Sequence, residues 1–356
     1  MLKRKTLRTL TKLFTQGLAP LLRATQAPRQ RKASAKPKPQ PKPAGRAKAS
    51  GLRTQARPAA KPVARAAAAG RWVKGLAISP AGARRYRLFL PPGPRAGTPM
   101  PLLLMLHGCD QDAASFAAST RMHQIAAREG FAVLFPEQDR LANVNGCWNW
   151  FATRNGQAQA EVSLLMQMVA QACTLYGADR ARVAIAGLSA GASMAALVAT
   201  RHPGRFQAVA MHSGVPPGAA RSGMGALAAM SGHAPRRPRP NEALPAATPW
   251  PALLVLHGSD DRVVHLRNAH LAVQAWSEAA GAQAQAPRAV QRGSRHPMQV
   301  TDHVAAGRNV ARLVEIASLG HAWSGGVASQ AYGDPRGPDA SRLLWAFVRE
   351  QLRTVV

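Results

Sequence analysis

A serine flanked by glycines is the first feature of this chain that could do covalent chemistry. Residues 187–191 read Gly-Leu-Ser-Ala-Gly, between the apolar, β-prone stretch Val183–Ala186 and the small-residue, helix-like segment Ala192–Arg201. A serine at such a strand-to-helix turn is held where its hydroxyl can reach a carbonyl carbon, and glycine stands where the turn is too tight for side chains. The pattern predicts that Ser189 is a nucleophile; the alternative is an ordinary serine in a glycine-rich turn.

A nucleophilic serine needs a base to take its proton and an anion to orient that base. These partners follow the serine in the order acid, then histidine. The acid candidate is Asp261 in His-Gly-Ser-Asp-Asp, just past a predicted strand, and its neighbour Asp260 is the alternative, with turn capping as its ordinary role. The base candidate is His321, which follows a glycine and a predicted strand and comes after Asp261. The competing histidines are His265, His296 and His303.

Backbone N–H groups must stabilise the oxyanion that forms when a carbonyl is attacked. The expected donors are the N–H of Ala190, which follows the nucleophile, and the N–H of Cys109, in the loop after His107-Gly108. Trp148, Trp150 and Trp323 are candidate apolar walls for an acyl chain, with core packing as the alternative for each.

The chain holds three cysteines, at 109, 147 and 173, and no C-x-x-C pair. This spacing argues against a metal site, and the proposed chemistry needs neither metal nor cofactor. Cys109 and Cys147 both fall in loops after predicted strands, so the two could form a disulfide in an oxidising compartment. Cys173 is expected to be a buried thiol on a helix.

Apolar strands alternate with helices through the second part of the chain, which predicts an α/β fold with a mostly parallel sheet and helices on both faces. The predicted strands are 85–90, 101–106, 131–135, 183–186, 207–211, 253–256 and 313–317, and the predicted helices are 113–129, 162–176, 266–280 and 341–352. Residues 232–250 are rich in Pro and Arg and are interpreted as a surface excursion beside the site, and residues 286–300 as irregular.

The formal charge of +31 is distributed very unevenly. No acidic residue precedes Asp110, and all ten lysines lie at or before Lys74. Residues 1–70 combine Lys-Pro alternation with an Ala/Arg run and hold few large apolar residues after Leu22, so we expect a disordered basic extension. Residues 71–356 are expected to form the catalytic domain.

The first 22 residues admit three interpretations. Leucines and a phenylalanine recur at helical spacing among basic residues, which is typical of a short amphipathic helix near 5–22 that lies on a surface. An unstructured leader is the second, and a secretory signal with an interrupted apolar run is the third. We expect residues 1–70 to contact a polyanion, granule or membrane surface without sequence-specific nucleic-acid binding, because no such binding motif is present.

Taken in order, several motifs resemble those of the poly(3-hydroxybutyrate) depolymerase family of esterases, which is related to feruloyl and acetylxylan esterases. The resemblance covers roughly residues 75–352. It is carried by Leu-His-Gly-Cys at 106–109, Pro-Glu-Gln at 136–138, Cys-Trp-Asn-Trp-Phe at 147–151, Gly-Leu-Ser-Ala-Gly at 187–191, His-Gly-Ser-Asp-Asp at 257–261, Gly-His-Ala-Trp-Ser-Gly-Gly at 320–326 and Asp-Pro-Arg-Gly-Pro-Asp-Ala-Ser at 334–341.

The resemblance implies an α/β-hydrolase with Ser189, Asp261 and His321 as its triad and a Cys109–Cys147 disulfide. It implies hydrolysis of short-chain polyhydroxyalkanoate or its oligomers through an acyl-enzyme. A feruloyl or acetylxylan esterase is one alternative, and a non-catalytic hydrolase-fold module that binds a granule or other surface is another. The resemblance also implies an extracellular protein; an intracellular, granule-associated protein is the alternative, because the signal-like run is interrupted.

Overall fold

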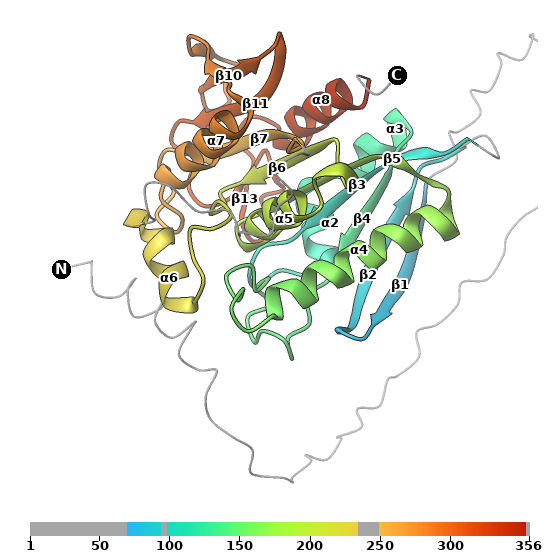
Figure 1. Ribbon diagram of the computed structural model, residues 1–356. Helices are drawn as coiled ribbons and strands as arrows, with labels where there is room; N and C mark the ends of the chain where they lie inside the picture. Colours follow the sequence, from blue (N-terminus) through green and yellow to red (C-terminus); the bar gives the residue numbers. More distant parts are fainter. Residues whose placement is uncertain (1–69, 94–97, 234–248, 354–356) are drawn as a thin grey trace, which may run out of the picture. The chain divides into compact units, whose positions relative to one another are not determined.

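The computed structural model describes residues 70–93, 98–233 and 249–353. These residues build an 11-stranded sheet and a two-stranded sheet (Figure 1). The strands are β1 (Arg71–Ser79), β2 (Gly82–Leu90), β3 (Met100–Leu106), β4 (Ala132–Pro136), β5 (Ala178–Leu188), β6 (Ala208–His212), β7 (Ala252–Gly258), β8 (Gln283–Ala284), β9 (Arg288–Val290), β10 (Met298–Ala305), β11 (Arg308–Ile316), β12 (Trp323–Ser324) and β13 (Gly333–Asp334). The helices are α2 (Ala113–Thr120), α3 (Met122–Glu129), α4 (Gln157–Tyr176), α5 (Ala190–Arg201), α6 (Gly223–Ala228), α7 (Arg267–Ala280) and α8 (Ala340–Arg353), with shorter turns η1 (Pro203–Arg205) and η2 (Ala229–His233).

The large sheet is parallel in its middle and antiparallel at both edges. Its order is β1-β2-β4-β3-β5-β6-β7-β11-β10-β8, with β9 paired to β10. The pairings from β4 through β11 are parallel, while β1 and β2 on one side and β8, β9 and β10 on the other pair antiparallel. The expected α/β-hydrolase fold, with a mostly parallel sheet, is therefore confirmed.

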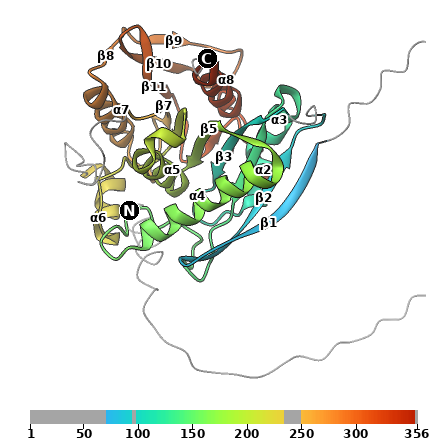
Figure 2. The same cartoon turned by 45° about the vertical axis from the view of Figure 1, so that its right-hand side comes forward.

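Helices cover both faces of this sheet because its central strands are apolar on both sides (Figures 1 and 2). Successive side chains of a strand point to opposite faces. In β3, Leu102, Leu104 and Leu106 belong to the core packed under α4, α5 and α7. Leu103 and Met105 belong to the core packed under α2, α3 and α8. Both faces of the central strands are therefore buried in hydrophobic cores.

Two predicted features differ in the structure, and some strands were not predicted. The helix expected over 113–129 is two helices, because Arg121 adopts a left-handed conformation with φ 51° between α2 and α3. Strands β1 and β10 were not expected, and β9 and the start of β10 lie within the stretch expected to be irregular. Of the predicted surface excursion, residues 234–248 lie outside the described residues, as do residues 1–69 of the basic extension.

The carboxyl ends of the parallel strands bring the candidate site residues to one edge of the sheet. Cys109 follows β3, Ser189 follows β5, Asp261 follows β7 and His321 follows β11. In an open α/β sheet this edge is where ligands bind. Across the described residues, no helix has the length and apolar character that crossing a membrane requires.

Candidate active site

Ser189 stands at the junction between β5 and α5, in a backbone conformation that L-residues rarely adopt. Its φ is 56° and its ψ −119°. Such a conformation costs on the order of 1–3 kcal/mol and persists only where the surroundings impose it. Part of that constraint comes from β6, because the N–H of Ser189 donates to the carbonyl of His212 at 2.8 Å. This is the sharp strand-to-helix turn that the sequence predicted.

The glycines on either side of Ser189 are required by close backbone contacts. A Cβ at Gly187 would collide with the backbone of Gly191, and a Cβ at Gly191 would collide with the carbonyls of Leu106 and His107. The first turn of α5 therefore lies directly against the end of β3. Ala190, the first residue of α5, has an N–H group that no intrahelical carbonyl can accept, as at any helix N-terminus.

Asp261 and His321 contact each other through their side chains. The Oδ2 atom of Asp261 lies 2.8 Å from Nδ1 of His321. The other carboxylate oxygen, Oδ1, accepts the N–H groups of Val263 and Val264, each at 2.9 Å. With both oxygens engaged, the carboxylate is fixed in orientation. It can hold the proton of His321 on Nδ1 and leave Nε2 as the basic nitrogen.

The electrostatic surroundings keep Asp261 ionised. Burial by itself would raise the pKa of this carboxyl group, but the hydrogen bond and electrostatic interaction with His321, the electrostatic interaction with His257 and the N–H of Val264 outweigh it and lower the pKa to about 2. The carboxylate is therefore negative at neutral pH and can stabilise a positive charge on the His321 ring.

The structure separates Asp261 and His321 from their sequence competitors. Asp260 is exposed, and its carboxylate accepts the Ser259 hydroxyl at 2.8 Å. The competing histidines have other partners: His265 accepts the N–H of Arg267, His296 pairs with Asp334 at 3.4 Å, and His303 contacts Ser277 at 2.8 Å.

Two fully buried histidines lie behind these residues. His257 donates from Nε2 to the carbonyl of Val264 at 2.8 Å, and the same nitrogen lies 3.5 Å from Oδ2 of Asp261. His212 accepts the N–H of Ser324 on Nε2 at 3.1 Å, three residues after His321. Because the His212 carbonyl also accepts the N–H of Ser189, this residue contacts both the serine turn and the histidine loop. Burial lowers the pKa of His212 to about 3, so its ring is neutral.

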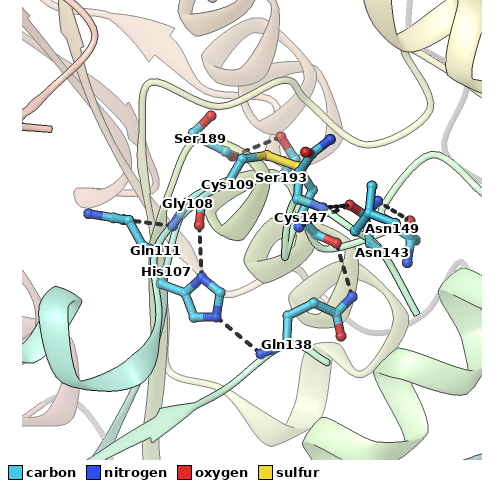
Figure 3. Close-up of a disulfide and its surroundings, with 12 residues drawn as sticks. His107, Gly108, Cys109, Gln111, Gln138, Asn143, Cys147, Asn149, Ser189 and Ser193 are labelled. Carbon is cyan, nitrogen blue, oxygen red and sulfur yellow. Dashed lines mark hydrogen bonds between the residues drawn. A yellow bond between two sulfur atoms is a disulfide. The ribbon is translucent and has the colours of Figure 1, made fainter. Parts of the chain in front are cut away.

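The loop after β3 lies beside Ser189 (Figure 3). A Cβ on Gly108 would be 3.6 Å from the Cβ of Ser189. His107 donates from Nδ1 to the carbonyl of Gly108 at 2.8 Å and accepts the N–H of Gln138 on Nε2 at 3.1 Å. These bonds hold Cys109, the expected second oxyanion donor, next to the serine turn.

The expected disulfide between Cys109 and Cys147 is present (Figure 3). It ties the loop after β3 to the segment before α4. That segment is held by Glu161, whose carboxylate accepts the N–H of Asn149 at 2.8 Å, its side-chain amide at 2.6 Å, and the amide of Gln138 at 2.7 Å. Burial raises the pKa of Glu161, against these hydrogen bonds. Cys173 is free but only partly buried, which corrects the expectation of a buried thiol.

The three candidate substrate-wall tryptophans are buried. Trp148 and Trp323 are each 1% exposed. Trp323 donates from Nε1 to the Ser341 hydroxyl and packs edge-on against Phe116, with ring centroids 5.4 Å apart. These contacts support the alternative interpretation, in which the tryptophans pack in the core and do not face a substrate. Trp150 is also buried but borders a small cavity beside Ser193.

The sequence did not single out Gln111, His212 or Tyr332 as site residues. Gln111 is buried; its Oε1 accepts the N–H of Gly108 at 2.9 Å, and its Nε2 donates to the carbonyl of Ala331 at 3.1 Å. Tyr332 stands edge-on to the His321 ring, with centroids 6.2 Å apart, and is 39% exposed. The available signals were slight: a glutamine two residues after His-Gly-Cys, and a histidine ending an apolar strand.

Two curated proteins of known activity are similar to part of this chain. Poly(3-hydroxyalkanoate) depolymerase C of Paucimonas lemoignei is 32% identical over 184 residues, which make up 50% of this chain and 44% of that protein. Feruloyl esterase B of Neurospora crassa is 29% identical over 203 residues, 51% of this chain and 65% of that protein. The chain thus spans less than two thirds of the length of each of these relatives.

Solved structures show the same fold at low sequence identity. An acetyl xylan esterase from Aspergillus awamori aligns with a TM-score of 0.59 and 18% identity, over 71% of this chain and 94% of that one. An acylaminoacyl peptidase of Pyrococcus horikoshii aligns with a TM-score of 0.52 and 14% identity, over 80% of this chain and 42% of that one. The family described as "Esterase PHB depolymerase" matches residues 84–293, more than half of the sequence and the part that holds Ser189 and Asp261. The chain belongs to the esterase PHB depolymerase family.

Proposed function

We propose that this protein is a serine esterase in which Ser189, His321 and Asp261 act in sequence. The observation that carries the proposal is the 2.8 Å contact between Asp261 and His321, at the sheet edge where Ser189 occupies a strained turn. An oriented imidazole and a serine lifted out of a strand-to-helix turn are the two parts that acyl transfer needs.

In the proposed reaction, the Ser189 hydroxyl attacks the ester carbonyl while His321 takes its proton on Nε2. The resulting oxyanion accepts the N–H groups of Ala190 and Cys109. The alcohol leaves with the proton from His321, and an acyl group stays on Ser189. Water, deprotonated by His321, then attacks the acyl carbon and releases the acid.

The substrate that we favour is a short-chain polyhydroxyalkanoate or its oligomers. Four large apolar side chains are exposed in segments that follow the carboxyl ends of the strands: Leu141 (96%) and Val144 (58%) after β4, Met224 (78%) in α6 after β6, and Tyr332 (39%) just before β13. Such side chains suit contact with an apolar polyester. The similarity to a poly(3-hydroxyalkanoate) depolymerase supports the same class.

A feruloyl or acetylxylan ester is the second candidate. It is supported by the 29% identity to a feruloyl esterase. The two candidates differ in the group beside the scissile bond, a flexible aliphatic chain in one and an aromatic acid or a sugar in the other.

A substrate panel tests the proposal. Release of acid is measured from hydroxybutyrate oligomers, feruloyl esters and acetylated sugars, with the Ser189→Ala protein as the blank. Higher kcat/KM on the oligomers supports the polyester assignment, and higher kcat/KM on the feruloyl or acetyl esters overturns it. Absence of turnover on every ester, with no labelling of Ser189 by a fluorophosphonate, would instead support the non-catalytic binding module.

A further inference from the structure

The β1–β2 hairpin presents an exposed face that the proposed reaction does not use. Direct cross-strand pairs on one face are Trp72 with Phe89, Lys74 with Arg87, Leu76 with Arg85 and Ile78 with Ala83. Two of these pairs are apolar, one is cationic, and in the fourth Leu76 stands opposite Arg85. We call these eight residues the hairpin face.

Its apolar side chains become progressively uncovered toward the turn. Near the start of β1, Trp72 packs on Phe89 and on His123 of α3, with centroids 5.2 and 5.4 Å apart. Its exposed fraction is nevertheless 41%, and that of Leu76 is 48% and of Ile78 66%. Pairing of β2 with β4 stops at Tyr86 and Pro136, so the part with Leu76 and Ile78 extends past the last residue of β4. β1 is also the edge of the sheet (Figures 1 and 2).

The charges on this face are of one sign. Lys74 and Arg85 are exposed and Arg87 is half-buried. Glu137, whose N–H donates to the carbonyl of Arg85, is the acidic residue that adjoins the hairpin at the end of β4. The hairpin face itself therefore holds three cations and no carboxylate. In addition, residues 1–70 of the same chain hold nine lysines, nine arginines and no acidic residue.

From this combination we propose that the hairpin face binds an anionic lipid surface. Exposed aliphatic side chains and a tryptophan suit the boundary between headgroups and acyl chains, and Lys and Arg beside them attract anionic headgroups. A second copy of this chain fits less well, because pairing two such faces would place the cations of one copy against the cations of the other. Nucleic acid would use the cations and Trp72 but leave Leu76 and Ile78 in water.

The experiment compares two positions of nearly equal exposure in the full chain. Ile78 on the hairpin face is 66% exposed, and Leu175, on α4 across the sheet, is 64% exposed. Binding of Ile78→Ser and Leu175→Ser is measured by sedimentation with vesicles of phosphatidylcholine alone and of phosphatidylcholine with phosphatidylglycerol in equal parts. The basic extension is unchanged in both proteins, so its contribution cancels. Thermal unfolding followed by circular dichroism shows that each variant is folded, without reference to esterase activity.

We expect Ile78→Ser to lower the partition coefficient on the mixed vesicles about tenfold, because one large aliphatic side chain no longer enters the lipid. Leu175→Ser should match the parent protein. Lys74→Gln should lower the partition coefficient about fivefold on the mixed vesicles and leave the partition coefficient on phosphatidylcholine vesicles unchanged. Equal binding by the Ile78 and Leu175 variants would overturn the proposal. A change from dimer to monomer on Ile78→Ser, or loss of oligonucleotide binding on Lys74→Gln with vesicle binding intact, would assign the face to another partner and equally overturn it.

Discussion

The Oδ2 atom of Asp261 lies 2.8 Å from Nδ1 of His321, whereas the exposed Asp260, one residue away, accepts the Ser259 hydroxyl with its carboxylate and donates its backbone N–H to the carbonyl of Leu319. Two neighbouring aspartates therefore have different surroundings, and they form a matched pair for mutation. Asp261→Asn keeps the shape of the side chain but removes the negative charge that holds the imidazole proton on Nδ1.

We predict that Asp261→Asn lowers kcat on a p-nitrophenyl ester about 10⁴-fold with little change in KM, because the histidine loses its basic tautomer. Asp260→Asn should stay within about twofold of the parent protein. Steady-state kinetics on both variants tests this. Equal losses for the two variants would show that Asp261 does not orient a catalytic base.

A second prediction concerns His212, which we regard as a positioning residue. Its Nε2 accepts the N–H of Ser324 and its carbonyl accepts the N–H of Ser189. His212→Leu leaves the buried Ser324 N–H without an acceptor and should lower kcat about tenfold to a hundredfold while KM changes little.

The control for His212→Leu is His212→Gln, whose side-chain oxygen can accept the same bond and should recover most of the lost kcat. A loss of thermal stability without any change in kcat would show that His212 serves the fold alone.

The disulfide predicts a large stability effect. Cys109 and Cys147 are 38 residues apart, and closing a loop of this length stabilises the folded state by about 4 kcal/mol on chain-entropy grounds. Replacing both cysteines by serine should lower the free energy of unfolding by an amount of this order. It should also lower kcat, because the loop that carries the proposed oxyanion N–H of residue 109 is no longer tied to residue 147.

Equilibrium unfolding in urea measures the change in the free energy of unfolding. Cys173→Ser, at the free cysteine, is the control and should change it little. If the double variant is as stable and as active as the parent protein, the disulfide has neither role.

Buried neutral histidines predict that stability falls in mild acid. Burial lowers the pKa of His107 to about 4 and that of His212 to about 3, against 6.5, and it also lowers the pKa of His257. Below pH 6.5 these histidines become protonated in the unfolded chain but stay neutral in the folded chain. The contribution of the buried histidines to the free energy of unfolding is therefore full above pH 6.5. It decreases as the pH falls toward 3, by up to about 1.4 kcal/mol per pH unit for each histidine.

The measurement is the free energy of unfolding in urea between pH 7 and pH 4. His107→Gln should reduce its slope against pH relative to the parent protein. A slope that His107→Gln leaves unaltered would contradict the neutral, buried state of that ring.

The sequence predicted the central strands and the helices that cover them because these elements are apolar over continuous stretches. Strands β1 and β10 are half-exposed antiparallel strands in which Lys74, Gly75 or Asp302 interrupt the apolar pattern, so they were missed. The break at Arg121 was missed as well, because a left-handed arginine has no sequence signal of the kind that glycine gives.

The candidate site shows the same limit at the scale of single residues. Ser189, Asp261 and His321 stand in short motifs at fixed places after strands, so the sequence alone could nominate them as candidates. The roles of His212 and Gln111 rest on contacts with Ser324 and Ala331, which are more than 100 residues away in the chain. Such contacts exist only after folding, and no local pattern reports them. The burial of Trp148 and Trp323 could not be separated from a substrate-facing position for the same reason.

Identifying the residue that reacts with a fluorophosphonate tests the central claim most directly. The protein is treated with the probe and digested, and the modified peptide is sequenced by mass spectrometry. The account predicts one adduct, on Ser189, and slower labelling after Asp261→Asn or His321→Ala. An adduct on a different serine, or an unlabelled Ser189 in protein that hydrolyses esters, would contradict it.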